Sequence, residues 1–599
     1  MHRRSLYAVL LGCLTLLTLR TAAPPRNVLT WDVFGYYLYL PATVIHHDVA
    51  LQDRTWLDEV MARYEPSGTL YQLVDGPDGR RVIKYSAGMA VLYAPFFLIA
   101  HGVAPLSGHP ADGFSPPYQY ILAYGCLLYA FLGLFVFRRV LLHFFSDGLA
   151  AALILLTVFG TNYLHLAAWD GTLLTHTPLF LLYALLLQAT IRWHDLPGLG
   201  HALQIGLWVG LITLVRPSEG VALLIPLLWL PKGQGWRAKW AMVRARPGQL
   251  LAAAAAFLVA VSPQAIYWHI VTGQWIFYSY VNPGEGFDFF PPHLANFLFS
   301  YRKGWLLYTP LMVLALAGIP LLWRKEHGTF WAIALFTVAN LWVVSAWTTW
   351  WYAGGSFSSR SMVPAYTVLA LPLGHALRAL SRHRMLRVVT GLFIGGAVLL
   401  NLFQTWQWKQ GILPKDRVTK AYYRAIFGRT SVPAGADTLL MVERSTGEGA
   451  RFTDEGRYTR RLLCHYTFDD EAEGSFLLTE GTPWSPGPDI PFSELTAHDH
   501  AWLRISARLW VGDSLPAGPP PVLVATFHHL GQTYEYRTGH WELPPGVHNQ
   551  WVSAHMDYLT PEARSPQDNL KVYAWNGHGG NWRVDDLRVE VWEPKVHGP

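Results

Sequence analysis

The sequence predicts a polytopic α-helical membrane protein that ends in a β-sandwich, and three observations point to this fold. Of 599 residues, 52% are hydrophobic and only 14% are charged, against about 25% charged in an average soluble protein. Apolar runs recur from residue 6 to residue 406, many near the length of about 20 residues that crosses a bilayer. After residue 436, short alternating segments separated by Gly, Pro and Asp take over, as in a β-sandwich.

The apolar runs predict about 11 transmembrane helices. They lie near residues 6–22, 118–137, 148–166, 173–191, 198–215, 217–231, 249–270, 304–323, 328–346, 361–380 and 388–406. The first run also fits a cleaved signal peptide, because basic residues precede it and "TAAPP" follows it. Further spans follow along the chain, so we expect residues 1–22 to be the first transmembrane helix.

Lys and Arg in the short loops predict the orientation. With a cytoplasmic N-terminus, the inner segments hold clusters such as Arg138-Arg139 and the run 232–246, whereas the short outer loops keep few basic residues. Those few are Arg216, Arg302, Lys303 and Arg360. The formal net charge of +6 is therefore interpreted as a topology signal, with no nucleic-acid partner, because the basic residues form short clusters between apolar runs.

The distribution of Lys and Arg also predicts whether two ambiguous segments cross the membrane. Both Arg192 and the run 232–246 belong inside, so the chain crosses twice between them and turns at Arg216-Pro217. Residues 84–101 are apolar, but a span there would invert everything downstream, so we expect an interfacial or re-entrant helix.

The predicted organisation therefore has five parts. Residues 23–117 form a long extracytoplasmic loop with helices near 32–46, 55–64 and 86–100, and residues 118–406 form the transmembrane bundle. Residues 407–436 are a membrane-surface linker, and residues 437–599 are an extracytoplasmic, jelly-roll-like sandwich. Strands are expected at "WLRISARLWV", "NLKVYAWN" and "DDLRVEVWE", with a hairpin turning near Gly531. We expect the protein to lie in a bacterial-type inner or plasma membrane.

The predicted outer loops carry acidic and basic residues that are candidates for catalysis and for phosphate binding. The acids are Asp32, Asp48, Asp170, Glu285 and Asp288, and the cations are Lys84, Arg216, Arg302, Lys303 and Arg360. A few carboxylates facing cations at a lipid boundary suit transfer from a lipid-linked phosphate. The cations stabilise the leaving phosphate, and a carboxylate takes a proton or holds a metal.

The stretch "WDVFGYYLYLPA" (residues 31–42) has one acid before a tyrosine-rich segment. It resembles the first outer loop of the GT-C superfamily of integral-membrane glycosyltransferases, which includes aminoarabinose transferase and protein O-mannosyltransferases. The segments "KYSAG", "LVRP", "SYRKGWLLYTP" and "WWYAGGSFSSR" are also similar, and the resemblance covers about residues 6–410. It implies a catalytic Asp32 and a Lys84 that contacts a donor phosphate. Many relatives have Asp-Glu where this chain has Asp32-Val33, so Asp170 is our candidate helper or metal ligand.

The predicted site therefore divides by role. Catalytic residues are Asp32 and Asp170; donor-phosphate ligands are Lys84, Arg216, Arg302, Lys303 and Arg360; substrate contacts are Tyr36, Tyr37, His176, Trp351 and Glu285. We also expect the tyrosines at 36, 37 and 39 to lie on the membrane-facing side of the helix that aims Asp32. A cofactor is not specified by the sequence, and a divalent cation is an open alternative.

Structural interpretations compete with each of these roles. Asp32 and Asp170 can cap helices, the outer cations can bind lipid headgroups, Arg216 can pair with Glu219, and His176 can be a hydrogen-bonded core residue. The tryptophan group around Trp351 also suits an interfacial belt.

The function predicted is glycosyl transfer from a polyprenyl-phosphate-sugar donor to a glycan, lipid or protein acceptor, with inversion. The sandwich resembles a carbohydrate-binding jelly roll, most clearly in "WRVDDLRVEVW", although such sandwiches also serve as structural covers. Two other classes stay open: a transporter or flippase for a lipid-linked sugar, and a non-catalytic membrane scaffold. A transporter is expected to have charged residues within its spans and repeated halves with broken helices.

Overall fold

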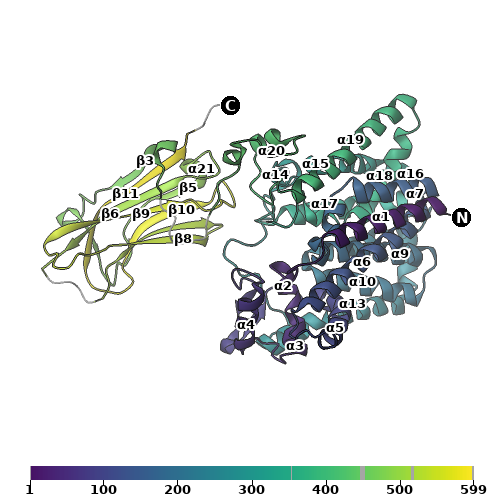
Figure 1. Cartoon of the computed structure of the whole chain (residues 1–599), viewed down its shortest axis with the longest axis horizontal. Helices are drawn as coiled ribbons and strands as arrows, with labels where there is room; N and C mark the ends of the chain where they lie inside the picture. The colour runs from purple at the N-terminus through teal and green to yellow at the C-terminus, as the bar shows by residue number, and fades with distance from the viewer. Residues whose placement is uncertain (1, 353, 445–451, 514–517, 596–599) are drawn as a thin grey trace. The chain divides into compact units, whose positions relative to one another are not determined.

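The computed structural model describes residues 2–352, 354–444, 452–513 and 518–595, with the side chains at 170 and 472 set aside. The chain divides into two compact units. Unit 1 holds residues 1–281 and 287–437, and unit 2 holds residues 282–286 and 438–599. Figure 1 shows helices in the first and strands in the second.

Unit 1 is a helical bundle, and each predicted apolar run coincides with helical structure. Its longer helices are α1 (Arg3–Ala22), α5 (Gly88–Leu106), α6 (Pro116–Phe144), α7 (Asp147–Phe159), α9 (His176–Asp195), α10 (Leu199–Val215), α13 (Pro247–Thr272), α16 (Met312–Lys325), α17 (His327–Ser345), α18 (Tyr366–Leu380) and α19 (Arg384–Lys409). Shorter helices are α8 (Tyr163–Ala168), α11 (Leu224–Leu228), α12 (Trp236–Arg244), α14 (Leu294–Phe299), α15 (Trp305–Tyr308) and α20 (Lys420–Ile426). The 3-10 turns η2 (Asp170–Leu173), η3 (Pro217–Leu223) and η4 (Arg360–Met362) join some of them.

Within the described residues, 6 helices are long and apolar enough to cross a membrane: α1, α5, α6, α13, α17 and α19. That content is typical of an integral membrane protein. By length and composition α5 is among them, whereas the distribution of Lys and Arg in the loops predicts that it lies in the interface. The total of about 11 spans and the orientation stay predictions.

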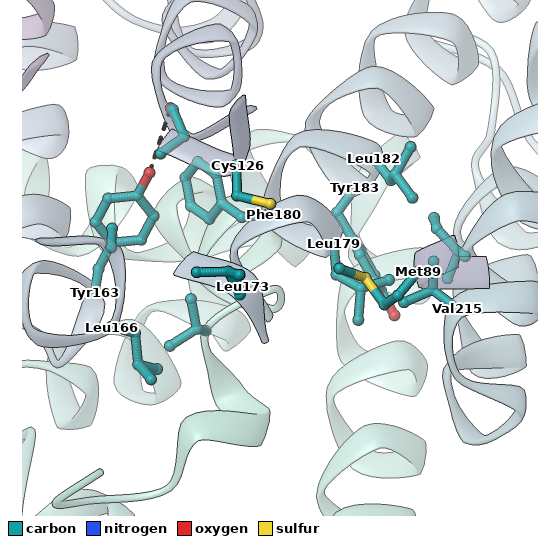
Figure 2. Packing of buried hydrophobic residues seen from close by; sticks show 14 of the residues in the cluster. Met89, Cys126, Tyr163, Leu166, Leu173, Leu179, Phe180, Leu182, Tyr183 and Val215 are labelled. Atoms are coloured by element: carbon teal, nitrogen blue, oxygen red, sulfur yellow. Dashed lines mark hydrogen bonds between the residues drawn. The ribbon is translucent and has the colours of Figure 1, made fainter. Parts of the chain in front are cut away.

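The bundle core joins helices that are distant in sequence. Figure 2 shows Phe180 of α9 beside Tyr163 of α8 and Cys126 of α6, and the rings of Tyr163 and Phe180 have centroids 4.8 Å apart. On α10, a Cβ at Gly206 would lie 1.9 Å from the carbonyl oxygen of Ala253 on α13, so only glycine permits this approach. Lipid is as apolar as these side chains, so close packing of this kind holds membrane helices together.

The long first loop folds at one end of the bundle, where Figure 1 shows α2 (Asp32–Tyr37), α3 (Tyr39–Val44) and α4 (Thr55–Tyr64) gathered. A hairpin of β1 (Leu73–Asp75) and β2 (Arg81–Ile83) follows, and then α5. Helices are therefore present at all three predicted positions, with the first one divided between α2 and α3, and the interfacial placement of α5 stays a prediction.

Tyr37 and Tyr39 do not face a membrane, so the prediction is wrong for these two tyrosines. Tyr37 has no exposed surface and Tyr39 is 6% exposed. The Tyr37 hydroxyl donates to the carbonyl of Gly113, and the Tyr39 hydroxyl donates to the carbonyl of Tyr85 at 2.6 Å. The two side chains face inward because the rest of the long loop folds over α2 and α3 and supplies these acceptors.

Unit 2 is a two-sheet sandwich, as predicted. Its elements are β3 (Tyr458–Tyr466), β4 (Phe476–Leu478), β5 (Asp489–Pro491), α21 (Phe492–Leu495), β6 (Trp502–Val511), β7 (Val522–His529), β8 (Gln532–His540), β9 (Gln550–Leu559), β10 (Asn569–Trp575) and β11 (Trp582–Pro594). One sheet has the order β5-β10-β7-β8, and the other β3-β11-β6-β9 with β4 beside β11. Alternate residues of both sheets form one core. The predicted hairpin turns at Leu530-Gly531, between β7 and β8.

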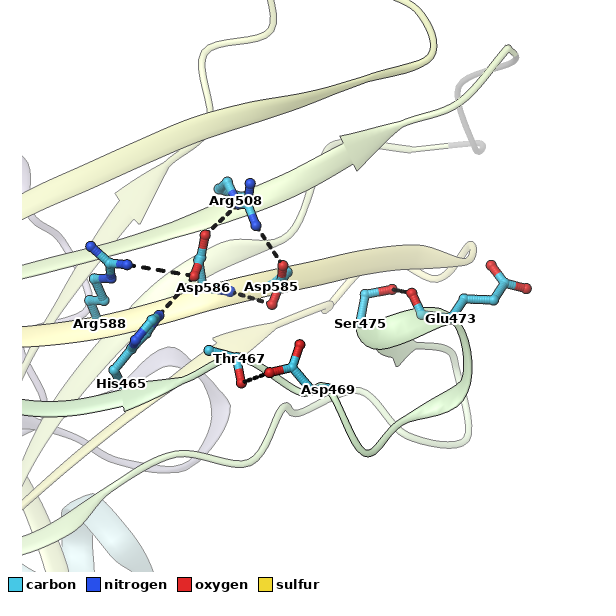
Figure 3. Close-up of polar contacts among 9 residues, drawn as sticks. All are labelled: His465, Thr467, Asp469, Glu473, Ser475, Arg508, Asp585, Asp586 and Arg588. Carbon is cyan, nitrogen blue, oxygen red and sulfur yellow. Dashed lines mark hydrogen bonds and ion pairs between the residues drawn. The ribbon is translucent and has the colours of Figure 1, made fainter.

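The acids of "WRVDDLRVEVW" form ion pairs on the outer face of the five-stranded sheet (Figure 3). The Arg508 guanidinium lies 2.8 Å from Asp585 and 2.6 Å from Asp586. Asp586 also contacts His465 at 2.7 Å and Arg588 at 3.8 Å. These acids and bases form ion pairs across three strands, so the network stabilises the sheet.

Candidate active site

Asp32 lies at the start of α2, where its carboxylate meets groups from three other segments. The Tyr71 hydroxyl donates to Oδ1 at 2.9 Å and the Tyr85 hydroxyl at 2.7 Å. The Arg360 guanidinium donates to Oδ2 at 3.2 Å. The helix-cap interpretation is wrong, because the cap position is Trp31 and no side chain caps α2. The Asp32 carboxylate points instead into this group, with 28% of the side chain exposed.

These neighbours fix the ionisation of Asp32. Burial raises the pKa of the carboxyl, but Arg360, the hydroxyls of Tyr85 and Tyr71, and the charge of Lys84 together outweigh it, so the pKa lies below its usual value. Burial first, and then the Asp32 charge, raise the pKa of both tyrosines, so both hydroxyls stay protonated donors. At neutral pH Asp32 is therefore a carboxylate.

The β1–β2 hairpin positions the two tyrosines. Its register pairs Leu73 with Ile83, and two further residues along each strand are Tyr71 and Tyr85. The ladder continues in part, because the Lys84 N–H donates to the carbonyl of Gln72 at 2.8 Å. The hairpin thereby delivers two hydroxyls to one carboxylate oxygen, although 14 positions separate them in the sequence.

Gly35 permits the approach of Tyr85. A Cβ at Gly35 would lie 2.4 Å from Cδ2 of the Tyr85 ring and 2.6 Å from Cε2. On the next residue, the Tyr36 ring packs on Tyr85 with centroids 4.6 Å apart. The Tyr36 pKa is raised by burial and then by the Asp32 charge, and lowered by Arg216 and Arg360. Tyr36 therefore lies within the Asp32 group, as predicted for a substrate contact.

Arg216 is brought to the same place. Its guanidinium donates to Nδ1 of His176, the first residue of α9, at 3.5 Å and lies 6.0 Å from the Tyr352 ring centroid. Among the described side chains, no carboxylate lies within 4.0 Å of Arg216, because Glu219 instead accepts from Tyr183 at 2.7 Å. The expected pairing of Arg216 with Glu219 is not formed. A guanidinium without a matching carboxylate near Asp32 is suited to an anionic ligand.

The segment around Ser86 and Gly88 packs against Val215, the residue before Arg216, and so brings Lys84 and Arg216 into one region. A Cβ at Gly88 would lie 2.3 Å from the backbone nitrogen of Val215, and the Ser86 hydroxyl donates to the Val215 carbonyl at 3.2 Å. The Lys84 side chain is 3% exposed, and its ammonium lies 5.3 Å from the Tyr280 ring centroid.

The loop before η4 positions Arg360. A Cβ at Gly355, where φ is +72°, would lie 2.5 Å from Nη1 of Arg360. The Lys303 ammonium donates to the carbonyls of Tyr352 at 2.7 Å and Gly354 at 2.8 Å, and the Arg360 guanidinium lies 5.6 Å from the Tyr352 ring centroid. Burial lowers the pKa of Lys303 to about 7. Lys303 therefore supports the loop that precedes Arg360, and its donors are directed at backbone carbonyls.

Arg302 is matched by an acid that the sequence did not suggest. Its Nε and Nη2 donate to the two carboxylate oxygens of Asp416 at 2.6 and 2.9 Å. Its guanidinium lies 4.2 Å from the centroid of the Trp351 ring. This bidentate, stacked arrangement fixes the position of Arg302. Arg302 and Trp351 therefore pack on each other, and their contact supports the local structure.

Three predicted site residues are not assigned to the Asp32 group. Tyr37 is buried among aromatic rings with its hydroxyl bonded to Gly113, away from Asp32. Glu285 belongs to unit 2, where its carboxylate accepts from Asn282 at 3.2 Å. The side chain of Asp170 lies outside the described residues. Its backbone begins η2.

The described surroundings of Asp32 do not fit a divalent cation. Mg²⁺ and Ca²⁺ take several oxygen ligands, carboxylates above all, whereas the groups around Asp32 are two hydroxyl donors and cations. Within the described part of the chain, no group of three or more His, Cys, Asp or Glu is placed to hold a metal ion. We therefore derive no step through a metal.

Sequence reasoning missed Tyr71, Gly35 and Asp416. Tyr71 stands in "LYQLV" and Asp416 in "LPKDR", where neither segment carries a pattern that marks a site. Tyr85 is part of the segment "KYSAG", so this motif already contained one of the two tyrosines that contact Asp32. Each omitted contact joins residues that are distant in the chain.

No protein-family model matches the chain, and no curated protein matches it. Among solved structures, the chain is similar to the oligosaccharyltransferase of Archaeoglobus fulgidus, with 14% sequence identity and a TM-score of 0.36. The similarity covers 75% of this chain and 61% of the archaeal protein, less than two thirds of its length.

Proposed function

We propose that the protein is a membrane glycosyltransferase that moves a sugar from a polyprenyl-phosphate donor to a hydroxyl acceptor on the extracytoplasmic face. The observation that carries this proposal is an Asp32 carboxylate 3.2 Å from Arg360, in the same cluster as an Arg216 that has no carboxylate within 4.0 Å among the described side chains. The Asp32 carboxylate suits a general base, and the Arg216 guanidinium suits the binding of a phosphate.

The two arginines divide the donor phosphate between them in this proposal. A guanidinium offers paired N–H donors that match phosphate oxygens. Arg216 is available for the phosphate, and Arg360 shares its donors between the phosphate and Asp32. Lys84 adds positive charge nearby, since it lowers the pKa of Asp32. Arg302 and Lys303 are not assigned to the phosphate, because their donors already bind Asp416 and backbone carbonyls.

Donor binding prepares the base. With Arg360 beside it, the pKa of Asp32 is lowered, and a carboxylate of low pKa is a weak base. A bound phosphate draws part of the Arg360 charge to itself, so the pKa of Asp32 rises toward the range in which general-base catalysis is effective. The base therefore becomes active once the donor is present.

The reaction proposed is a single displacement. The acceptor oxygen forms a bond to the anomeric carbon while the bond from that carbon to the phosphate oxygen breaks. Asp32 takes the proton of the acceptor hydroxyl, and polyprenyl phosphate leaves with the electron pair, held by Arg216 and Arg360. Attack from the opposite side inverts the anomeric configuration.

Asp32→Asn tests the base. The amide oxygen still accepts from Tyr71 and Tyr85, but it takes no proton, so we expect transfer to fall by about 10² to 10⁴-fold. Asp48→Asn is the matched control, because Asp48 is another acid of the same loop and its carboxylate accepts from the backbone N–H groups of Gln52 and Asp53. Unchanged transfer by the Asp32→Asn protein would refute the role of Asp32. A retained anomeric configuration in the product would refute single displacement.

A further inference from the structure

The outer face of the four-stranded sheet in unit 2 carries two exposed tryptophans side by side. Trp484 and Trp575 form an antiparallel β-bridge, and residues that face each other across such a bridge point to the same side of the sheet. Trp484 is 58% exposed and Trp575 is 38% exposed. The core-facing neighbour Ala574 is fully buried, so both indoles point away from the core. Such large exposed aromatic surface marks an interaction site.

The backbone holds this pair in place. Around the bridge, the Asn576 N–H donates to the carbonyl of Pro483 at 2.8 Å and the Ser485 N–H to the carbonyl of Ala574 at 3.0 Å. A Cβ at Gly577 would lie 2.6 Å from the Trp575 ring, so that ring lies across the Gly577 backbone. The platform is therefore pre-formed, and a ligand does not have to order it.

Polar groups continue the same face along β10. Tyr573 and Lys571 follow Trp575 at alternate positions, with half-buried and exposed side chains, respectively. Lys571 lies opposite Asp489 of β5, and their charged groups are 3.3 Å apart. Asp489 also accepts from Asn569 at 2.9 Å. The face thus combines aromatic rings at one end with exposed donors and acceptors, and its two charges compensate each other.

We propose that this face, built from Trp484, Trp575, Tyr573, Lys571 and Asp489, binds a neutral oligosaccharide. The C–H bonds on one face of a pyranose ring form an apolar surface with slightly positive hydrogens, and the face of an indole carries negative potential. Two indoles side by side suit two successive sugars, while Lys571, Asp489 and Asn569 bind hydroxyl groups. A compensated pair of charges gives no attraction to a polyanion or to anionic lipid.

This proposal stands without the transferase proposal, because binding to unit 2 requires no donor and no chemistry at Asp32. Its link to the acceptor rests on the proposed function: a glycan held here is the acceptor class that we expect. The Asp32→Asn protein separates the two, since it is expected to lose transfer and to bind oligosaccharide with unchanged affinity.

The test measures binding by the full chain in lipid nanodiscs, because alkyl-glycoside detergents offer competing sugars. The probes are immobilised neutral hexasaccharides of glucose, mannose, galactose or N-acetylglucosamine. We expect at least one to bind, and we expect Trp484→Ala and Trp575→Ala each to raise its Kd by about tenfold or more. Trp575→Phe keeps an aromatic face and is expected to keep most of the affinity. Trp510→Ala is the matched control, because Trp510 is a half-buried tryptophan on the outer face of the other sheet.

Three results would overturn the proposal: no binding to any probe, wild-type Kd in both alanine variants, or an equal loss in the Trp510→Ala protein. A membrane-contacting role is distinguished by nanodiscs of brominated phosphatidylcholine. If replacing Trp484 and Trp575 by Phe removes lipid-quenched fluorescence, the indoles lie in the membrane, and the glycan proposal fails. A melting temperature close to that of the wild type checks that each exposed-site variant is folded.

Discussion

Arg360 donates to the carboxylate of Asp32 at 3.2 Å, although 328 positions separate the two residues in the chain. This ion pair joins the start of η4 to the start of α2. It also sets the charge of the base, because Arg360 is the strongest of the groups that lower the pKa of Asp32.

Arg360→Gln is expected to move the acid limb of the kcat/KM profile to higher pH. In the wild type the lowered pKa keeps Asp32 ionised, so the acid limb lies below the usual range of an aspartate. Without the guanidinium, the largest of the effects that oppose burial is lost, so the pKa of Asp32 rises and activity at acidic pH falls relative to activity at pH 7. Arg302→Gln is the control, since Arg302 pairs with Asp416. An acid limb that does not move in the Arg360→Gln protein would show that the ion pair does not set the ionisation of the base.

Gly35→Ala is expected to displace the Tyr85 ring and with it the hydrogen bond to Asp32. The added methyl group would lie 2.4 Å from the ring, and a shift of about 1 Å at a reacting group costs about 10²-fold in rate. Alanine otherwise favours a helix, so a purely local effect would not lower activity. Gly102→Ala in α5 is the control, because nothing lies within 4 Å of its Cβ position. Equal transfer rates in the two variants would contradict the positioning role.

Gly355→Ala and Gly354→Ala separate backbone strain from the position of Arg360. Both glycines have positive φ, +72° and +75°, so alanine costs about 1–2 kcal/mol at either site. Only the methyl group at 355 meets Arg360, 2.5 Å from Nη1. We expect similar losses of thermal stability, but a much larger loss of transfer in the Gly355→Ala protein. The same activity in both would place the effect in the backbone alone.

Arg216 and Arg302 are expected to differ in what their removal changes. Arg216→Gln removes a guanidinium without a carboxylate partner among the described side chains, so the donor KM rises by about 10- to 100-fold with little loss of stability. Arg302→Gln breaks a bidentate pair whose side chains are 9% and 23% exposed, so stability falls by about 1–3 kcal/mol with little change in KM. Melting temperatures and donor titrations measure both. A raised KM in the Arg302→Gln protein, without destabilisation, would assign the phosphate to Arg302 instead.

The pairing of Arg302 with Asp416 is checked by a double-mutant cycle. Arg302→Gln and Asp416→Asn are each expected to destabilise the protein, and the double variant is expected to lose less than the sum of the two, because the shared contact is removed once. Additive losses would contradict the pair.

Most elements were predictable from local patterns. The apolar runs coincide with helices, "WLRISARLWV" coincides with β6, and the loop helices at 55–64 and beyond residue 86 are present. These features depend on periodicity over a few neighbouring residues, which is a property of the sequence itself. The prediction for Tyr37 and Tyr39 failed because it used only local composition. A tyrosine-rich segment indicates an interface, but the partners that bury these side chains, such as Gly113, lie far along the chain.

By itself the sequence determined the classes of element, and it singled out Asp32, Arg216 and Arg360 as charged residues in loops between apolar runs. The tertiary structure alone decided which charges meet. It placed Arg360, Tyr71 and Tyr85 on Asp32, and it gave Arg302 to Asp416. The physical reason is that an ion pair or a hydrogen bond depends on distance in space, whereas helices and strands arise from neighbours in the chain.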